Sequence, residues 1–231
     1  MIQLDVCKQE SIASAVDTIK SKYGGLYGLV NNAGGSLSSA KQTLDLNLYA
    51  VINVTEAFLP LIQDQGKIVQ ISSAAGPMFV SKCSEDVQKM FVNKNVTFKE
   101  IEEHVAKPFL AIKGDESLND DQKTEALEKI GLNDAGFGGN GYGASKACLN
   151  AYTMEKARDN PNILINSCTP GFIETDLTRP FAAQSGKTPE EMGMKPIENG
   201  AKSAVYLMMT DLRSELPGYQ SGWYYGSDAV R

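Results

Sequence analysis

The sequence predicts an α/β fold: a Rossmann-like, doubly wound parallel sheet flanked by helices. Short apolar runs alternate along the chain with amphipathic segments of helical period. The runs are apolar throughout, as expected for strands covered on both faces of a parallel sheet. Several of them end in small polar residues. Since ligands bind beyond the carboxyl ends of such strands, this edge of the sheet is predicted to hold the site.

Five segments are predicted as strands: residues 2–6, 26–30, 67–71, 163–168 and 222–225. The first helix is predicted over residues 10–22, where Ile12, Ala15 and Ile19 share one face and glycines follow. Further helices are predicted over residues 40–62, 142–157 and 197–209.

Residues 81–140 interrupt this alternation with a polar, charged stretch that contains helical segments near residues 84–92, 97–112 and 120–130. They have too few apolar residues for a core of their own, so we expect an insertion in a single domain covering residues 1–231. The Gly136-x-Gly138-x-x-Gly141 pattern matches a dinucleotide-binding loop. No β-branched strand precedes it, and we interpret it as the loop that ends the insertion.

Composition narrows the functional classes. A net charge of −6 argues against a nucleic-acid surface, and no apolar run approaches membrane-spanning length. The four cysteines form no CxxC pair and His104 is the single histidine, so no metal site is predicted. Four thiols in a mid-sized domain and the absence of a signal-peptide pattern favour a reducing, cytoplasmic location. We expect a small-molecule partner and neither nucleic acid nor membrane.

Tyr142 and Lys146 lie one turn apart on a predicted helix and therefore on one face. An ammonium beside a phenol favours the phenolate, which predicts a lowered pKa for Tyr142 and a role as general acid near neutral pH. The alternative is a solvated pair on a helix surface, and this spacing alone does not distinguish the two.

Other polar residues fall at strand ends. Ser72 and Ser73 follow a strand and precede a small-residue loop, where a hydroxyl either stabilises a carbonyl oxygen or caps a turn. Asn47 sits on an apolar helix, so its amide either faces a cavity or holds a water. Two further loops offer backbone that can approach a ligand closely: Asn31, Asn32, Ala33 and Gly34 in the first, and Pro170 and Gly171 in the second. Thr175, just after the second loop, can hydrogen-bond an amide.

The order of these motifs, from Asp5-Val6 through NNAG, Asn47, Ser73 and YxxxK to PGxxxT, resembles the short-chain dehydrogenase/reductase family over the whole chain. It is most similar to the monomeric NADPH-dependent carbonyl reductases, which share a long helical insertion between the serine and the tyrosine. The resemblance implies reduction of aldehydes, ketones or quinones by NADPH. It also implies a monomer, because the insertion would obstruct the helices that form dimers in related enzymes.

By this resemblance, Tyr142 donates the proton, Lys146 lowers its pKa and binds the nicotinamide ribose, Ser73 orients the carbonyl and Asn47 holds a water. The implied cofactor-binding residues flank the adenine or line the nicotinamide: Asp5, Val6, Asn31, Asn32, Ala33, Gly34, Tyr142, Lys146, Pro170, Gly171, Ile173 and Thr175.

The chain departs from the family at its start, where no TGxxxGxG turn for the pyrophosphate precedes residue 2. We therefore expect an N-terminally truncated chain whose first strand is detached and whose second has an open edge. Two alternatives stay open: a short-chain alcohol or steroid dehydrogenase favouring oxidation, and a non-catalytic remnant acting as a binding module. Upstream coding sequence with that turn would favour an enzyme.

Overall fold

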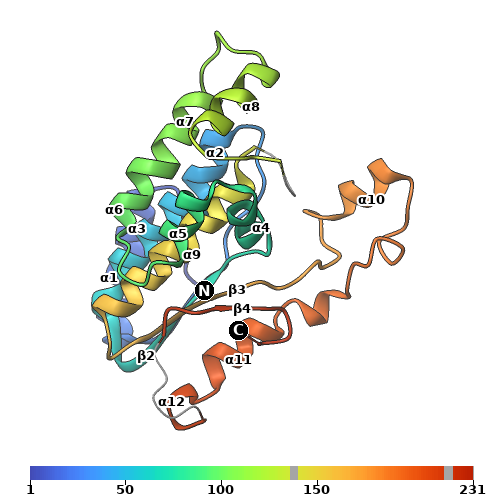
Figure 1. Cartoon of the computed structure of the whole chain (residues 1–231). Coiled ribbons are helices and arrows are strands. Elements are labelled where there is room, and N and C mark those ends of the chain that lie inside the picture. Colours follow the sequence, from blue (N-terminus) through green and yellow to red (C-terminus); the bar gives the residue numbers. More distant parts are fainter. Residues whose placement is uncertain (136–139, 216–220, 231) are drawn as a thin grey trace.

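The computed structural model describes residues 1–135, 140–215 and 221–230. Its centre is a parallel sheet of β1 (Leu26–Asn31), β2 (Ile62–Ile71), β3 (Leu164–Cys168) and β4 (Tyr224–Tyr225), in that spatial order (Figure 1). The register pairs Val69 of β2 with Val30 on one side and with Asn166 on the other. The predicted α/β class is confirmed.

Helices cover the two faces unequally. Helices α1 (Gln9–Tyr23), α3 (Ala50–Phe58) and α9 (Tyr142–Asp159) pack on one face, and α11 (Lys202–Met209) packs on the other (Figure 1). Every strand was expected to be covered by helices on both faces of the sheet. This expectation is wrong for β1, where the side chains of Tyr27 and Val30 are 53% and 42% exposed. Met208 of α11 reaches Gly28, but Val30 stays open to solvent on this edge strand.

The strand predicted over residues 2–6 is wrong. Residues 1–5 have no regular structure, and the chain turns at residues 6–7 into α1. The backbone groups of Asp5 are used in that turn, since its N–H donates to Ser11 Oγ and its carbonyl accepts from Lys8 N–H. An apolar run forms a β-strand only when it pairs with a neighbouring strand, and β1 pairs with β2 instead.

The single helix predicted over residues 40–62 is interrupted. It consists of α2 (Ala40–Leu44), the π-helical turn η1 (Asp45–Tyr49), α3 and the 3-10 turn η2 (Leu59–Leu61). Ile62 already belongs to β2, which is longer than predicted. The π turn rotates the helix at Asn47, and such turns occur often at functional sites.

The insertion is helical, with α5 (Glu85–Val92), α6 (Phe98–Ile101), the π turn η3 (Glu102–Ala106), α7 (Lys107–Lys113) and α8 (Asp120–Lys129). Capping boxes begin α6 at Thr97 and α8 at Asn119. Its apolar side chains share one cluster with the main body, in which Phe109 and Leu127 join Leu48 and Leu149.

A further helix, α4 (Ala75–Lys82), replaces the small-residue loop expected after Ser73. Its small residues serve close helix packing instead. A Cβ added at Gly76 would lie 3.0 Å from the backbone of α9, and one added at Gly143 would lie 3.1 Å from Ala75 O. Helix α4 therefore holds the start of α9 at short range.

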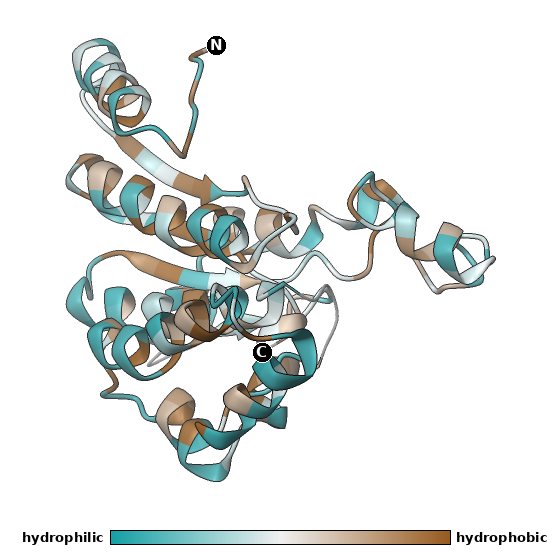
Figure 2. Ribbon diagram, turned by 90° about the horizontal axis from the view of Figure 1, so that it is seen from above, coloured by the Kyte–Doolittle hydropathy of each residue, from teal (hydrophilic) through white to brown (hydrophobic). Residues whose placement is uncertain are grey.

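The C-terminal part contains α10 (Arg179–Ser185), η4 (Ile197–Asn199), α11 and α12 (Leu212–Glu215). The segment with α10 projects from the body in both views (Figures 1 and 2). Backbone hydrogen bonds close its base, from Lys195 N to Phe172 O and from Glu174 N to Lys195 O. In the part of the chain that the structure describes, no helix has the length and apolar character to cross a bilayer. Gly136 and Gly138 of the glycine pattern lie outside the described residues.

Candidate active site

A pocket of about 690 Å³ opens at the carboxyl ends of the strands, where the fold predicted it. Loops after β1, β2 and β3 contribute to it, and so do the first turns of α9. Tyr142, Lys146 and Ser73 all line this pocket. Residues that are far apart in the sequence are thus brought to one cavity.

Tyr142 is the first residue of α9 and is 9% exposed. Burial raises the pKa of its phenol, and a side-chain hydrogen bond with Ser73 lowers it by a smaller amount. The prediction that Lys146 lowers this pKa is therefore wrong for the protein alone. Removing the phenol from water disfavours the phenolate more than the surrounding groups favour it.

Lys146 lies one turn further along α9 and is 4% exposed. Its Nζ donates to the carbonyl oxygen of Ile71 at the end of β2, at 2.8 Å, and lies 5.8 Å from the centroid of the Tyr142 ring. Burial lowers the pKa of Lys146 to about 8. The alternative of a solvated surface pair is wrong, since both side chains are buried against the pocket.

Ser73 has the turn-capping role, one of the two that its position allowed. Its Oγ accepts from the N–H of Ala75 at 3.2 Å, which ties the hydroxyl to the start of α4. The same hydroxyl is hydrogen-bonded to Tyr142. The neighbouring Ser72 is buried, and its N–H donates to Cys168 O of β3 at 2.7 Å.

Asn47 does not line the pocket but lies beneath it, fully buried. Its Nδ2 donates to Gly35 O at 2.8 Å and its Oδ1 accepts from Gly35 N–H at 2.9 Å. Nδ2 also reaches Ser145 Oγ at 3.2 Å. The amide therefore joins the loop after β1 to α9.

The residues of the Asn-Asn-Ala-Gly loop separate into different positions. Asn32 and Gly34 line the pocket, and Ala33 is exposed outside it. Asn31 is buried below, where its Nδ2 donates to Thr55 Oγ1 and to Gln70 Oε1. A Cβ added at Gly34 would lie 2.9 Å from Asn47 Oδ1 and 3.6 Å from Lys146 Nζ, so the loop backbone lies directly against this lysine.

The loop after β3 forms the opposite wall with Pro170, Gly171, Ile173 and Thr175. Gly171 has a φ of +91°, and an added Cβ would meet Ser227 Cβ at 2.9 Å. Glycine is thus required here by both conformation and space. The N–H of Thr175 donates to Thr178 Oγ1, which fixes the turn at the pocket edge.

Asp5 and Val6 do not line this pocket. Asp5 pairs with Lys8 at 3.2 Å in the turn before α1, and Val6 packs against the cluster that contains Ile12 and Ala15. The structure thus places them with α1.

The sequence reasoning missed two parts of the site. Ser145 is fully buried, accepts from Asn47 and donates to Tyr142 O at 2.7 Å, so it connects Asn47 with the first turn of α9. An apolar wall comes from η4 and α11, with Ile197, Val205 and Met209. Their exposure, 60%, 54% and 77%, is unusual for apolar helix residues and is a signal that only the structure supplies. Among the described residues, no cluster of side chains suits a metal ion.

The fold and this site define a dehydrogenase or reductase of the Rossmann class. The family profile of short chain dehydrogenases matches residues 1–84. Carbonyl reductase [NADPH] 3 of Rattus norvegicus is 30% identical over 217 residues, which cover 90% of this chain and 71% of the relative. Carbonyl reductase [NADPH] 1 of Bos taurus is 30% identical over 225 residues, which cover 93% of this chain and 74% of the relative. The chain belongs to the short-chain dehydrogenase/reductase family.

Comparison with solved structures supports the same fold. Salutaridine reductase from Papaver somniferum superposes with a TM-score of 0.73 at 25% identity, covering 96% of this chain and 80% of that one. An NADPH-bound carbonyl reductase from chicken fatty liver superposes with a TM-score of 0.61 at 18% identity, and the match covers 99% of this chain and 75% of that one. This likeness supports the fold.

Proposed function

We propose that the protein reduces carbonyl compounds to alcohols with NADPH, with Tyr142 as the proton donor. One observation carries the proposal: Tyr142, Ser73 and Lys146 line a single pocket at the carboxyl ends of the strands. The curated relatives named carbonyl reductase [NADPH] support the same cofactor and substrate class. Aldehydes, ketones and quinones are the proposed substrates.

The residues present fit the nicotinamide end of such a cofactor. Gly34 has no Cβ, so its backbone comes close to the Lys146 ammonium, which we propose as the partner of the ribose. Asn32 lies on the same side, and Pro170, Gly171, Ile173 and Thr175 form the facing wall for a carboxamide. Bound NADPH supplies the hydride to the carbonyl carbon. We assign no cofactor contact in this pocket to Asp5, Val6, Asn31 or Ala33, which do not line it.

In this proposal, Ser73 donates a hydrogen bond to the substrate oxygen and Tyr142 gives its phenolic proton to the same oxygen as charge develops there. Lys146 stabilises the resulting phenolate. Asn47 and Ser145 position the loop after β1 and the start of α9. We retain for Asn47 the role of holding a water that leads from Lys146, with its side chain fixed by Gly35.

The raised pKa of Tyr142 supports reduction over oxidation. A phenol with a pKa above its ordinary value stays protonated at neutral pH, and reduction needs the protonated form. Oxidation of an alcohol would need the phenolate as base, which burial disfavours.

The test is NADPH oxidation at 340 nm with an aromatic quinone such as menadione. Tyr142→Phe keeps the ring and removes the proton donor, and we expect kcat to fall about 10²- to 10⁴-fold. Binding of NADPH, followed by its fluorescence, should stay within a small factor. Tyr23→Phe is the matched control because Tyr23 is 68% exposed at the end of α1. Equal turnover in wild type and Tyr142→Phe would remove the assignment.

We also propose that the chain acts as one domain and as a cytoplasmic monomer. The shared cluster of insertion and main-body residues supports the first point. For the second, α6 and η3 of the insertion pack against α9 and occupy a surface that another copy would need. Sedimentation equilibrium at several concentrations tests this, and a mass of two chains would contradict it.

A further inference from the structure

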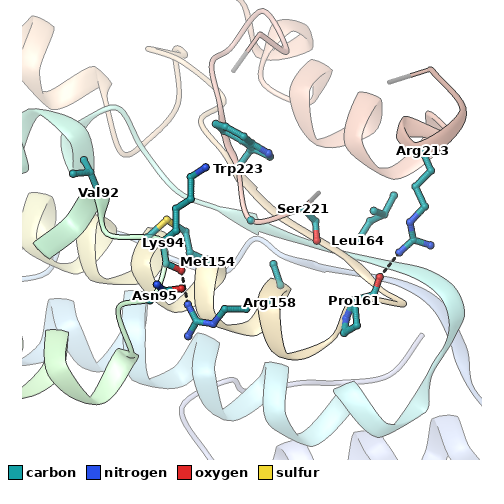
Figure 3. Close-up of a pocket in the computed structure, with 12 residues that line it drawn as sticks. Val92, Lys94, Asn95, Met154, Arg158, Pro161, Leu164, Arg213, Ser221 and Trp223 are labelled. Carbon is teal, nitrogen blue, oxygen red and sulfur yellow. Dashed lines mark hydrogen bonds between the residues drawn. The ribbon is translucent and has the colours of Figure 1, made fainter. Parts of the chain in front are cut away.

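A second pocket, also of about 690 Å³, lies at the opposite, amino-terminal edge of the sheet (Figure 3). Leu164 is the first residue of β3 and Trp223 directly precedes β4, and both line it. The other walls come from the end of α9 and from the chain after α5. None of its lining residues belongs to the catalytic pocket.

The charges of this pocket are of one sign, although the chain as a whole carries −6. Lys94, Arg158 and Arg213 line it, and no aspartate or glutamate of the described residues does. Among the described residues, the only ion pair of these cations joins Arg158 Nε to Asp159 at a loose 3.9 Å. Cations concentrated in a concave, partly apolar surface favour an anion.

Each terminal nitrogen of the two guanidinium groups already donates a hydrogen bond within the protein, and one of these runs from Arg213 Nη1 to Gln65 Oε1. Arg158 donates to Lys94 O at 2.7 Å and to Val96 O, and Arg213 donates to Pro161 O at 2.7 Å, as Figure 3 shows for two of these contacts. The Lys94 ammonium has no hydrogen-bond or ion-pair partner within the described ranges, and Figure 3 shows its side chain extending toward Trp223. The pocket therefore offers positive charge with part of its donors already in use, which suits a singly charged carboxylate better than a phosphate dianion, whose oxygens accept more hydrogen bonds.

Apart from Asn95 and Ser221, the other side chains of the lining are apolar. Val92, Met154, Ala157, Leu164 and Trp223 provide aliphatic, thioether and aromatic surface beside the three cations. A ligand that fills the cavity thus needs a hydrocarbon body as well as a negative charge, and the volume falls in the usual range for small-molecule sites. We infer that this pocket is a binding site for an aliphatic or aromatic carboxylate, separate from the catalytic pocket.

The test uses Trp223, the single tryptophan of the chain, as an internal reporter. Octanoate, titrated below its micelle concentration, should change the Trp223 emission saturably because the ligand contacts the indole. The neutral analogue 1-octanol should bind at least about fivefold more weakly, since it lacks the charge that the cations attract. Ligand in the catalytic pocket would not touch Trp223.

Three variants complete the test. Lys94→Gln and Arg213→Gln should each raise the octanoate Kd about fivefold or more, and Lys94 is exposed, so its replacement leaves the fold intact. Lys99→Gln removes the same charge from the same insertion without touching the pocket and should leave the Kd unchanged. Absence of a saturable change, equal binding of octanoate and octanol, or equal effects of Lys94→Gln and Lys99→Gln would each overturn the inference.

Discussion

Replacing Lys146 with methionine should stabilise the protein at neutral pH. Burial lowers the pKa of Lys146 from 10.5 to about 8. Since one pKa unit corresponds to about 1.4 kcal/mol, the buried ammonium costs about 3 kcal/mol of folding free energy at pH 7. Lys146→Met removes this cost but leaves Ile71 O without its donor, at about 1–2 kcal/mol. We therefore expect a net gain of about 1–2 kcal/mol at pH 7.

The pH dependence identifies the cause. Below pH 8, Lys146 is protonated in both the folded and the unfolded chain, so the wild type carries the full cost. Between pH 8 and 10.5 the folded protein releases the proton while the unfolded chain still holds it, so the free energy of unfolding of the wild type rises with pH. The stability difference should move by about 2.5 kcal/mol from pH 7 to pH 10, so the advantage of the variant is lost and the wild type becomes the more stable protein at pH 10.

Urea denaturation of wild type and Lys146→Met at pH 7 and pH 10, followed by far-UV circular dichroism, measures this difference. Lys99→Met, on the exposed side of α6, is the matched control and should change stability by about 0.5 kcal/mol or less at either pH. A stability difference between Lys146→Met and wild type that stays constant from pH 7 to pH 10 would refute the reasoning.

Three further predictions concern packing around the site. Gly171→Ala should lower the free energy of unfolding by at least about 2 kcal/mol, because Gly171 has a positive φ and the new methyl group would clash at 2.9 Å. Gly186→Ala is the control, since Gly186 has a positive φ but open space around it, and should cost about 1 kcal/mol. Urea unfolding of both variants measures the difference. Gly76→Ala should cost about 1–3 kcal/mol and reduce turnover, because the new methyl group pushes α9 away from α4; an unchanged Tm would contradict this. Asn47→Ala should cost about 2–4 kcal/mol through lost buried hydrogen bonds, and a smaller loss would show that the loop after β1 repacks.

The sheet was largely predictable from the sequence, because strand period and apolar character are local properties. The strands predicted at residues 26–30 and 163–168 agree with β1 and β3 to within one residue at each end. The strand predicted at residues 67–71 ends where β2 ends, but β2 begins earlier, at Ile62. The run at residues 2–6 has the same local character but pairs with no strand in the described part of the chain, and pairing is not a local property. The π turn at Asn47 was equally hidden, because it accompanies contacts with Gly35 and Ser145 that are distant in sequence.

The site was predictable as a set of positions but not in its electrostatics. Ser73, Tyr142 and Lys146 meet at one pocket as their places at strand and helix ends indicated. The direction of the Tyr142 pKa shift was not accessible, since the spacing reveals a neighbouring ammonium but not the burial that outweighs it. The apolar wall from α11 was not predictable from the sequence either, because it depends on where that helix packs.

The central claim is that the phenol of Tyr142 delivers a proton to a carbonyl that receives hydride from NADPH in this pocket. Single-turnover reaction with NADPH deuterated at the transferable C4 position, with mass spectrometry of the alcohol, tests it most directly. The account predicts deuterium on the carbinol carbon with wild type and a rate about 10²-fold or more lower with Tyr142→Phe. Deuterium transfer at the same rate in both proteins, or an alcohol without the label, would contradict it.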